Sequence, residues 1–375
     1  MAGIYIHIPF CKQACHYCDF HFSTSLKKKD EMLNALKQEL QIRKNEFKDE
    51  VIETIYFGGG TPSVLTTKEL ELLIGEVNRN YSVSEHPEIT LEANPDDLSS
   101  QKIKELRASP INRLSIGIQS FFEDDLKLMN RAHNADEAKN CLNEATRHFD
   151  NISIDLIYGI PGMSNEKWKQ NIKTALSFGV SHISSYALTV EPRTALEKFI
   201  KKGIIANVDD EISEQHFLIL VKLLKVNDFI HYELSNFGKE GYFSKNNTAY
   251  WLGKRYMGVG PSAHSYDGIR RSWNVSNNIK YIQSITENIL PSESEILKNT
   301  DKYNEYIMTG LRTIWGVSLN KVELEFGKNF KEYLVQQAEK YIQDNLLYYD
   351  DGILKTTGKG KFLTDGISSD LFILN

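Results

Sequence analysis

Short runs of β-branched and aromatic residues alternate with longer stretches of helical periodicity through the first half of the chain. Six runs are predicted as buried strands, at residues 3–8, 54–57, 88–92, 113–118, 152–157 and 182–187. Between them, apolar residues recur every three or four positions at residues 30–46, 67–79, 101–108, 135–147 and 165–178. This alternation is typical of βα units, so we expect an α/β fold with a partial (β/α)6 barrel.

The pattern changes after about Pro192. A helical stretch at 212–226 is followed by a polar and aromatic stretch at 231–273, and then by a mostly helical tail. The tail has predicted helices at 305–315 and 328–343, strand-turn-strand signals at 346–359 and a short last helix, which resembles a winged-helix-like module. We predict a barrel at 1–230, a connecting region at 231–290 and a C-terminal module at 291–375.

Composition and charge narrow the class of protein. The 375 residues carry a net charge of −6, so sequence-independent binding to nucleic acid is not expected. Four cysteines are too few for a secreted disulfide scaffold, and no apolar run is long enough to span a membrane. The first ten residues also lack the features of a signal peptide, so we expect a cytoplasmic protein.

Three of the four cysteines, Cys11, Cys15 and Cys18, fall within eight residues directly after the first predicted strand. Thiolates are soft ligands that suit an iron–sulfur cluster or zinc. A zinc site completed by His7, His16 or His21 is the alternative. A large α/β domain does not need a structural zinc, which favours a cluster, and three cysteines on four irons leave one iron open. Cys141, alone on a predicted helix, is expected to be a buried hydrophobe.

The Cys11-Cys15-Cys18 loop, with Tyr17 before its last cysteine, resembles the motif of the radical S-adenosylmethionine (SAM) superfamily. The runs YIHIPFC at 5–11, GGGTP at 58–62, LEANP at 91–95 and DLIYGIPG at 155–162 are similar to the coproporphyrinogen III oxidase-like branch. The resemblance implies a 4Fe–4S cluster, whose open iron binds SAM and cleaves it reductively to a 5′-deoxyadenosyl radical.

The same resemblance implies a set of SAM-binding residues. Glycines after a strand also free the backbone to approach a ligand, and carboxylates at strand ends accept hydrogen bonds from ribose hydroxyls or an ammonium group. An arginine side chain can bind a carboxylate group through charge-assisted hydrogen bonds. The residues that the resemblance places around SAM are Tyr5, Tyr17, Gly59, Gly60, Thr61, Glu92, Gln119, Arg131 and Asp155.

Two kinds of protein in this branch fit the chain. The oxygen-independent oxidase, an enzyme of porphyrin biosynthesis, has a further cysteine where this chain has Phe20, and a long extension where only ten residues precede Cys11. Both departures favour the haem chaperones of the branch, and the oxidase remains the alternative. The resemblance then implies haem as a third ligand and an acceptor protein, which can be membrane-bound, as partner. No catalytic residue is assigned.

The connecting region carries the haem-associated motif. The chaperones have His-Asn-x-x-Tyr-Trp, and this chain has Asn246 in place of the histidine, followed by Asn247, Tyr250 and Trp251. Since an asparagine amide is a poor substitute for an imidazole on haem iron, either another residue takes its place or haem binds weakly. We expect Tyr250, Trp251 and His264 to contact haem. The candidate axial ligands are His264 and Tyr250, and the histidines that rank below His264 are His7, His133 and His231.

Overall fold

Six parallel strands form the centre of a 12-stranded open sheet in the computed structural model, which describes residues 2–374. They follow one another in chain order from β1 to β6. Their bounds are Ala2–Ile8, Ile52–Gly59, Val83–Ala93, Arg113–Gln119, Ile152–Tyr158 and His182–Ala187. All seven residues of β4 are buried, as expected for a parallel strand covered on both faces. The predicted α/β fold with a partial barrel is confirmed.

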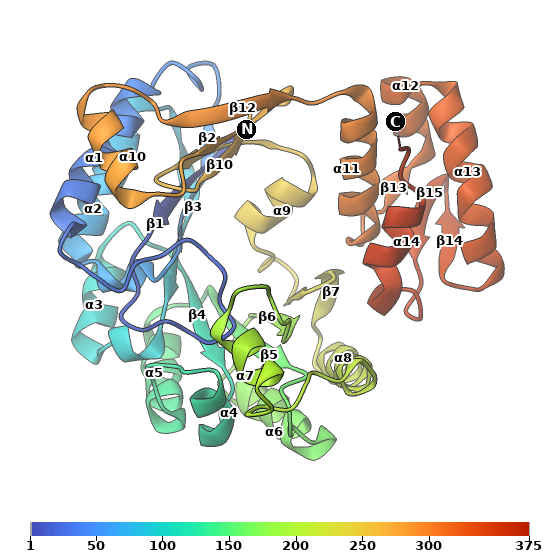
Figure 1. Cartoon of the computed structure of the whole chain (residues 1–375), viewed down its shortest axis with the longest axis horizontal. Coiled ribbons are helices and arrows are strands. Elements are labelled where there is room, and N and C mark those ends of the chain that lie inside the picture. The colour runs from blue at the N-terminus through green and yellow to red at the C-terminus, as the bar shows by residue number, and fades with distance from the viewer. Residues whose placement is uncertain (1, 375) are drawn as a thin grey trace.

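Helices connect the strands and cover the outer face of the sheet (Figure 1). In chain order α1 to α8 are Lys29–Ile42, Thr67–Asn80, Ser100–Ala108, Glu123–Leu128, Ala135–His148, Asn165–Ser177, Ala195–Lys201 and Asp210–Lys225. Thr66 caps α2 and Ser99 caps α3, as each side-chain oxygen accepts a backbone N–H of the first turn. The sequence did not predict the short helices α4 and α7. None of the helices within residues 2–374 is long and apolar enough to cross a membrane.

The stretch expected to be polar and aromatic extends the sheet at both edges. One edge gains β8 and β7, and the other gains β9, which pairs in parallel with β1, followed by β10, β11 and β12. From β7 to β12 the bounds are Ile230–Glu233, Asn236–Gly238, Arg255–Val259, His264–Tyr266, Arg270–Asn274 and Ser292–Ile296. Helix α9 (Lys245–Trp251) lies between the barrel and the C-terminal helices in Figure 1, and α10 (Asn278–Thr286) packs on α1.

The C-terminal module has its own apolar core. It contains α11 (Asn299–Leu311), α12 (Leu319–Phe326), α13 (Lys328–Gln343) and α14 (Thr364–Asp370) around the small sheet of β13 (Val317–Ser318), β15 (Ile353–Thr356) and β14 (Leu347–Asp350). The predicted helix at 328–343 is confirmed at both ends. The one predicted at 305–315 is α11, which starts earlier, at Asn299, and ends earlier, at Leu311, because residues 312–314 bond to β7 instead of continuing the helix.

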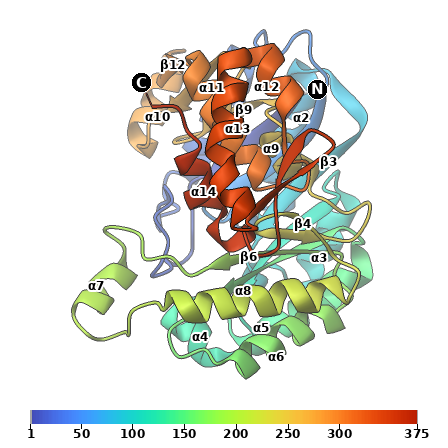
Figure 2. The ribbon, with the colours of Figure 1, turned by 90° about the vertical axis from the view of Figure 1, so that its right-hand side faces the viewer.

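The module is joined to the barrel through β7. The Leu234 N–H donates to the Arg312 carbonyl (2.9 Å), and the Ile314 N–H donates to the Tyr232 carbonyl (3.0 Å). Phe362 of the module also packs on Phe217 of α8, and Figure 2 shows the module standing beside that helix. These contacts place the end of α11 next to α9, near the carboxyl ends of the barrel strands.

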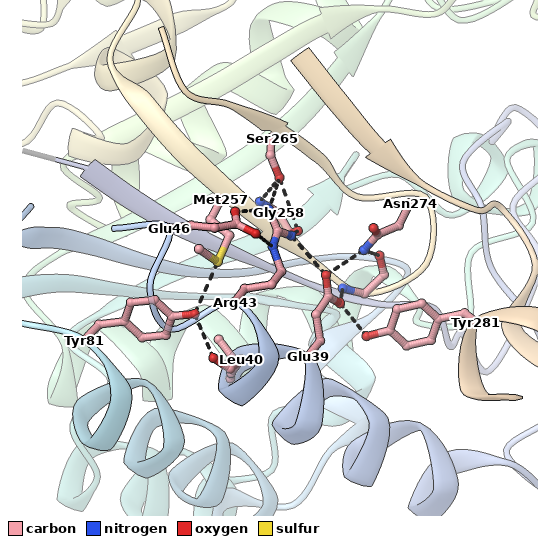
Figure 3. Close-up of polar contacts among 11 residues, drawn as sticks. Glu39, Leu40, Arg43, Glu46, Tyr81, Met257, Gly258, Ser265, Asn274 and Tyr281 are labelled. Atoms are coloured by element: carbon pink, nitrogen blue, oxygen red, sulfur yellow. Dashed lines mark hydrogen bonds and ion pairs between the residues drawn. The ribbon is translucent and has the colours of Figure 1, made fainter. Parts of the chain in front are cut away.

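A buried hydrogen-bond network around an ion pair of α1 joins this helix to the added strands (Figure 3). Glu39 is fully buried and pairs with Arg43 one turn later, at 3.0 Å. The Glu39 carboxylate also accepts hydrogen bonds from the Gly260 N–H, the Asn274 amide and the Tyr281 hydroxyl, at 2.8, 2.8 and 2.5 Å. This network holds the loop after β9 in place.

Candidate functional site

The three clustered cysteines lie on the loop after β1 and line one cavity of about 630 Å³. Cys11 is buried, and Cys15 and Cys18 are half-buried. Two donors from other βα loops reach the sulfurs: Thr61 Oγ1 donates to Cys11 Sγ, and Arg131 Nη1 donates to Cys15 Sγ, both at 3.3 Å. The thiols therefore face one volume at the carboxyl ends of the strands, where ligands bind in such folds.

This thiol cavity fits an iron–sulfur cluster better than zinc. Of residues 2–374, no histidine lines it, and no three His, Cys, Asp or Glu side chains are grouped to hold a single metal ion. Burial raises the pKa of the Cys18 thiol to about 11 and also raises that of Cys11, so deprotonation needs a cationic partner. The buried Arg131 Nε has no hydrogen-bond partner and leaves an unused donor at the cavity.

The glycines after β2 permit close packing between two strand ends. Gly59 has a φ of +108°, and a Cβ there would lie 2.4 Å from the His7 ring. A Cβ on Gly60 would lie 2.7 Å from the carbonyl oxygen of Phe10. Both glycines border the cavity, but a side chain at either position would clash with neighbouring protein atoms. The sequence predicted that these glycines let the backbone approach a ligand. It did not reveal that the packing of the protein itself also requires glycine at both positions.

Polar side chains from β3, from β4 and from the loop after α4 also line the thiol cavity. Glu92, at the end of β3, accepts hydrogen bonds from the Tyr56 hydroxyl (2.7 Å) and the Gly59 N–H (3.3 Å). Gln119 ends β4 at an irregularity in its pairing and has a φ of +66°, a strained conformation that is enriched at functional sites. Arg131 is fixed by the Asn94 amide oxygen at 2.6 Å and the Gly117 carbonyl at 2.8 Å.

Asp155, from β5, gives the cavity a pH-dependent charge. Burial, with the nearby Glu92 carboxylate, raises its pKa to about 7. Between its ordinary pKa and 7 the folded chain holds a proton that the unfolded chain has lost, so this group makes the ligand-free protein less stable as the pH rises. We therefore expect Asp155→Asn to melt above the wild type, by a margin that grows from pH 5 to pH 8. Thermal unfolding across that range, without ligands, measures the margin; a constant or shrinking margin would contradict the assignment.

A second cavity of about 870 Å³ adjoins the first one and is called the outer chamber below. The two share wall residues Asp19, Phe20, Gly59, Glu92 and Tyr186. Of the nine residues expected around SAM, eight line the thiol cavity, whereas Tyr5 lines the outer chamber and donates from its hydroxyl to His7 Nδ1 (3.1 Å). The outer chamber extends from the end of β1 to the joint with the C-terminal module.

The outer chamber brings together the three residues expected to contact haem. Tyr250 and Trp251 come from α9, and His264 comes from the start of β10. No described residue hydrogen-bonds to the His264 ring nitrogens. Both nitrogens of His7, in contrast, are occupied by Tyr5 and by the His21 carbonyl. His133 and His231 do not line the outer chamber.

Asn246, which replaces the motif histidine, points away from this chamber. Its side chain is buried, and its amide oxygen accepts a hydrogen bond from Thr54 of β2 at 3.1 Å. Its backbone N–H donates to Glu88 at 3.1 Å. The next residue, Asn247, lines the outer chamber instead. Position 246 in this chain therefore anchors α9 to the sheet.

Comparisons with known proteins agree with this arrangement. The model of the radical SAM superfamily matches residues 5–175, and that of the HemN C-terminal domain matches residues 297–363. The heme chaperone HemW of Bacillus subtilis is 35% identical to this chain over 97% of each, and that of Mycobacterium tuberculosis is 32% identical over 97% of this chain and 93% of its own. The chain belongs to the HemW family of heme chaperones. Its radical SAM domain spans the matched residues 5–175.

A solved structure similar to this HemW-family chain is coproporphyrinogen III oxidase (HemN) from Escherichia coli. The TM-score is 0.86 at 22% identity, and the match covers 99% of this chain and 90% of that one. At this identity the likeness shows a shared fold alone. Phe20, at the position where the resemblance implies a further cysteine in the oxidases, is 67% exposed and lies in the wall between the two cavities.

Two charged residues of the outer chamber that the sequence did not single out are Glu233 and Arg312. Arg312 follows α11, more than a hundred residues after the last barrel strand, and reaches the chamber only because the C-terminal module docks on β7. No local pattern signals such a contact. The register of Asn247 against Asn246 likewise depends on how α9 packs on β2.

Proposed function

We propose that this chain is a haem carrier that holds a 4Fe–4S cluster and SAM in the thiol cavity and haem in the outer chamber, and passes the haem to an acceptor protein. The observation that supports this proposal is the common wall of the two cavities, because a ligand bound in the outer chamber would lie beside the cluster site. The volume of about 870 Å³ is in the range of cofactor sites. Four free thiols among the described residues suit a reducing compartment such as the cytoplasm.

The chain's own residues have distinct tasks in this proposal. Cys11, Cys15 and Cys18 hold the cluster, which when bound supplies an open iron and an electron for SAM. Arg131 lies beside Cys15 and binds a carboxylate group. Glu92 and Asp155 accept hydrogen bonds from hydroxyl or ammonium groups. Gly59, Gly60, Thr61, Tyr17 and Gln119 shape the remaining wall, and Tyr5 borders it from the outer chamber.

Anaerobic titration of the cluster-loaded chain with haem tests the carrier function. We expect near-stoichiometric binding, seen as a shifted haem absorption band. When SAM and a reductant are supplied, coproporphyrinogen III is expected to remain unconverted. Formation of protoporphyrinogen IX would contradict the carrier proposal and support the oxidase alternative, whereas failure to bind haem would refute the proposal directly.

His264→Ala is expected to weaken haem binding by about tenfold or more, because a neutral imidazole with free ring nitrogens is a suitable axial ligand. The measurement is the haem dissociation constant, together with the position of the haem absorption band. His86→Ala is the matched control, since His86 is an exposed histidine on β3 that does not line the outer chamber. Equal affinities and unchanged spectra for both variants would remove His264 as the ligand.

A further inference from the structure

The charge balance of the outer chamber does not by itself suit a ligand with carboxylate groups. Its walls include three acidic side chains, Asp19, Glu92 and Glu233. Haem carries two propionates. Among the described residues that line this chamber, Arg312 is the sole lysine or arginine. Any recognition of the propionates by a cationic side chain in the chamber thus depends on this residue.

Arg312 reaches the chamber from the C-terminal module and is held at two edges. Its Nε and Nη2 donate to Glu233 Oε1 of β7, at 3.2 and 3.1 Å, and its Nη1 donates to Asp365 Oδ1 of α14, at 2.6 Å. These bonds use three of the five N–H donors of a guanidinium, so two remain. The guanidinium carbon lies 5.1 Å from the centre of the Trp251 ring, on the wall expected to face the macrocycle.

The two acidic partners of Arg312 differ in how firmly they are held. Glu233 is 1% exposed, and its carboxylate also accepts hydrogen bonds from the Ser235 N–H at 3.0 Å and the Asn236 amide at 2.6 Å. The Asp365 side chain is 67% exposed, and Arg312 is its ion-pair partner. An exposed ion pair contributes little stability, so Asp365 is the partner that an incoming carboxylate can replace.

We propose that Arg312 is the carboxylate anchor of the outer chamber, and that a haem propionate takes the place of Asp365 on its guanidinium while Glu233 keeps the other edge. This assignment rests on the proposed haem-carrier function and names the group that recognises the acidic end of the ligand. Because Arg312 belongs to the module and His264 belongs to the sheet, a ligand bound in this way contacts both parts of the chain.

Comparing haem with haem dimethyl ester, whose propionates carry no charge, isolates the contribution of the anchor. The full-length chain is titrated with each ligand by absorption. We expect the wild type to prefer haem by about tenfold or more, the usual effect of a hydrogen bond to a charged group, and Arg312→Ala to lose that preference. Asp365→Asn is expected to raise the affinity for haem several-fold and to leave that for the ester unchanged, because it frees the guanidinium.

The matched control is Arg271→Ala. Arg271 also forms an ion pair across the joint, with Glu305 of α11 at 2.6 Å, but it does not line the outer chamber. This variant is expected to keep the preference for haem. A preference that survives in Arg312→Ala, or an Asp365→Asn variant that binds haem more weakly than the wild type, would overturn the anchor alone. A wild type that binds neither ligand would overturn the carrier function and the anchor together.

Discussion

Cys18→Ala is expected to hold little iron or sulfide after anaerobic reconstitution, whereas the wild type holds about four of each per chain. The three thiols line one cavity, and no described histidine is present there to replace a lost sulfur. Cys18 is half-buried and on a loop, so its removal is expected to leave the fold intact. Iron and sulfide assays, with far-ultraviolet circular dichroism for the fold, measure both outcomes.

Cys141→Ala is the control for the cluster prediction. Cys141 is a buried thiol of α5 and does not line the thiol cavity, so its variant is expected to bind iron as the wild type does. Its cost is a small loss of stability, about 1 kcal/mol, from the cavity left in the core. Equal iron content in the two variants, whether high or low, would contradict the assignment of the cluster to the loop.

Glu39→Ala is expected to lower the free energy of unfolding by about 3–5 kcal/mol, because it leaves several buried hydrogen-bond donors without their acceptor. Arg43 keeps Glu46 as an ion-pair partner, at 2.8 Å. The Gly260 N–H and the side chains of Asn274 and Tyr281, in contrast, lose the Glu39 carboxylate as acceptor. Urea denaturation measures the change. Because Glu39 also holds the Gly260 N–H, in the loop that leads to His264, we expect weaker haem binding in this variant as well.

Glu31→Ala, on the same helix, is the control for Glu39. Glu31 pairs with Lys28 at the surface, where both side chains are about half exposed. Such pairs contribute roughly 0–1 kcal/mol, so this variant is expected to unfold close to the wild type. A Glu39→Ala variant as stable as Glu31→Ala would show that the buried network does not hold α1 to the added strands.

Local patterns were sufficient for the central part of the fold. Residues 152–157 and 182–187 are strand-length runs that each follow a predicted helix, and they form β5 and β6 with at most one residue of difference. Helix capping depends on the residue type at one position, and Thr66 and Ser99, which cap α2 and α3, are of the types that favour it. The strands within 231–273 could not be predicted from local patterns, because they are short and join the sheet through distant partners such as β1.

The candidate site likewise has one part that local sequence patterns predict, the thiol cavity, and one part that they do not, the outer chamber. The cysteines and the motif residues share one cavity because each follows a parallel strand, and strand ends meet at one edge of the sheet. The outer chamber depends instead on tertiary contacts. Asn246 faces Thr54 because of how α9 packs on β2, and Arg312 reaches Trp251 because the module docks on β7. Neither placement leaves a periodic signal in the sequence.

The central claim is that the cluster and the porphyrin bind side by side in two cavities with a common wall. The direct measurement is electron paramagnetic resonance of the cluster-loaded chain with copper(II) protoporphyrin IX bound in the outer chamber. When the cluster is reduced to its paramagnetic state, we expect the copper signal to broaden and relax faster than in Cys18→Ala, which lacks the cluster. A copper signal from bound porphyrin that is the same in both proteins would contradict the account.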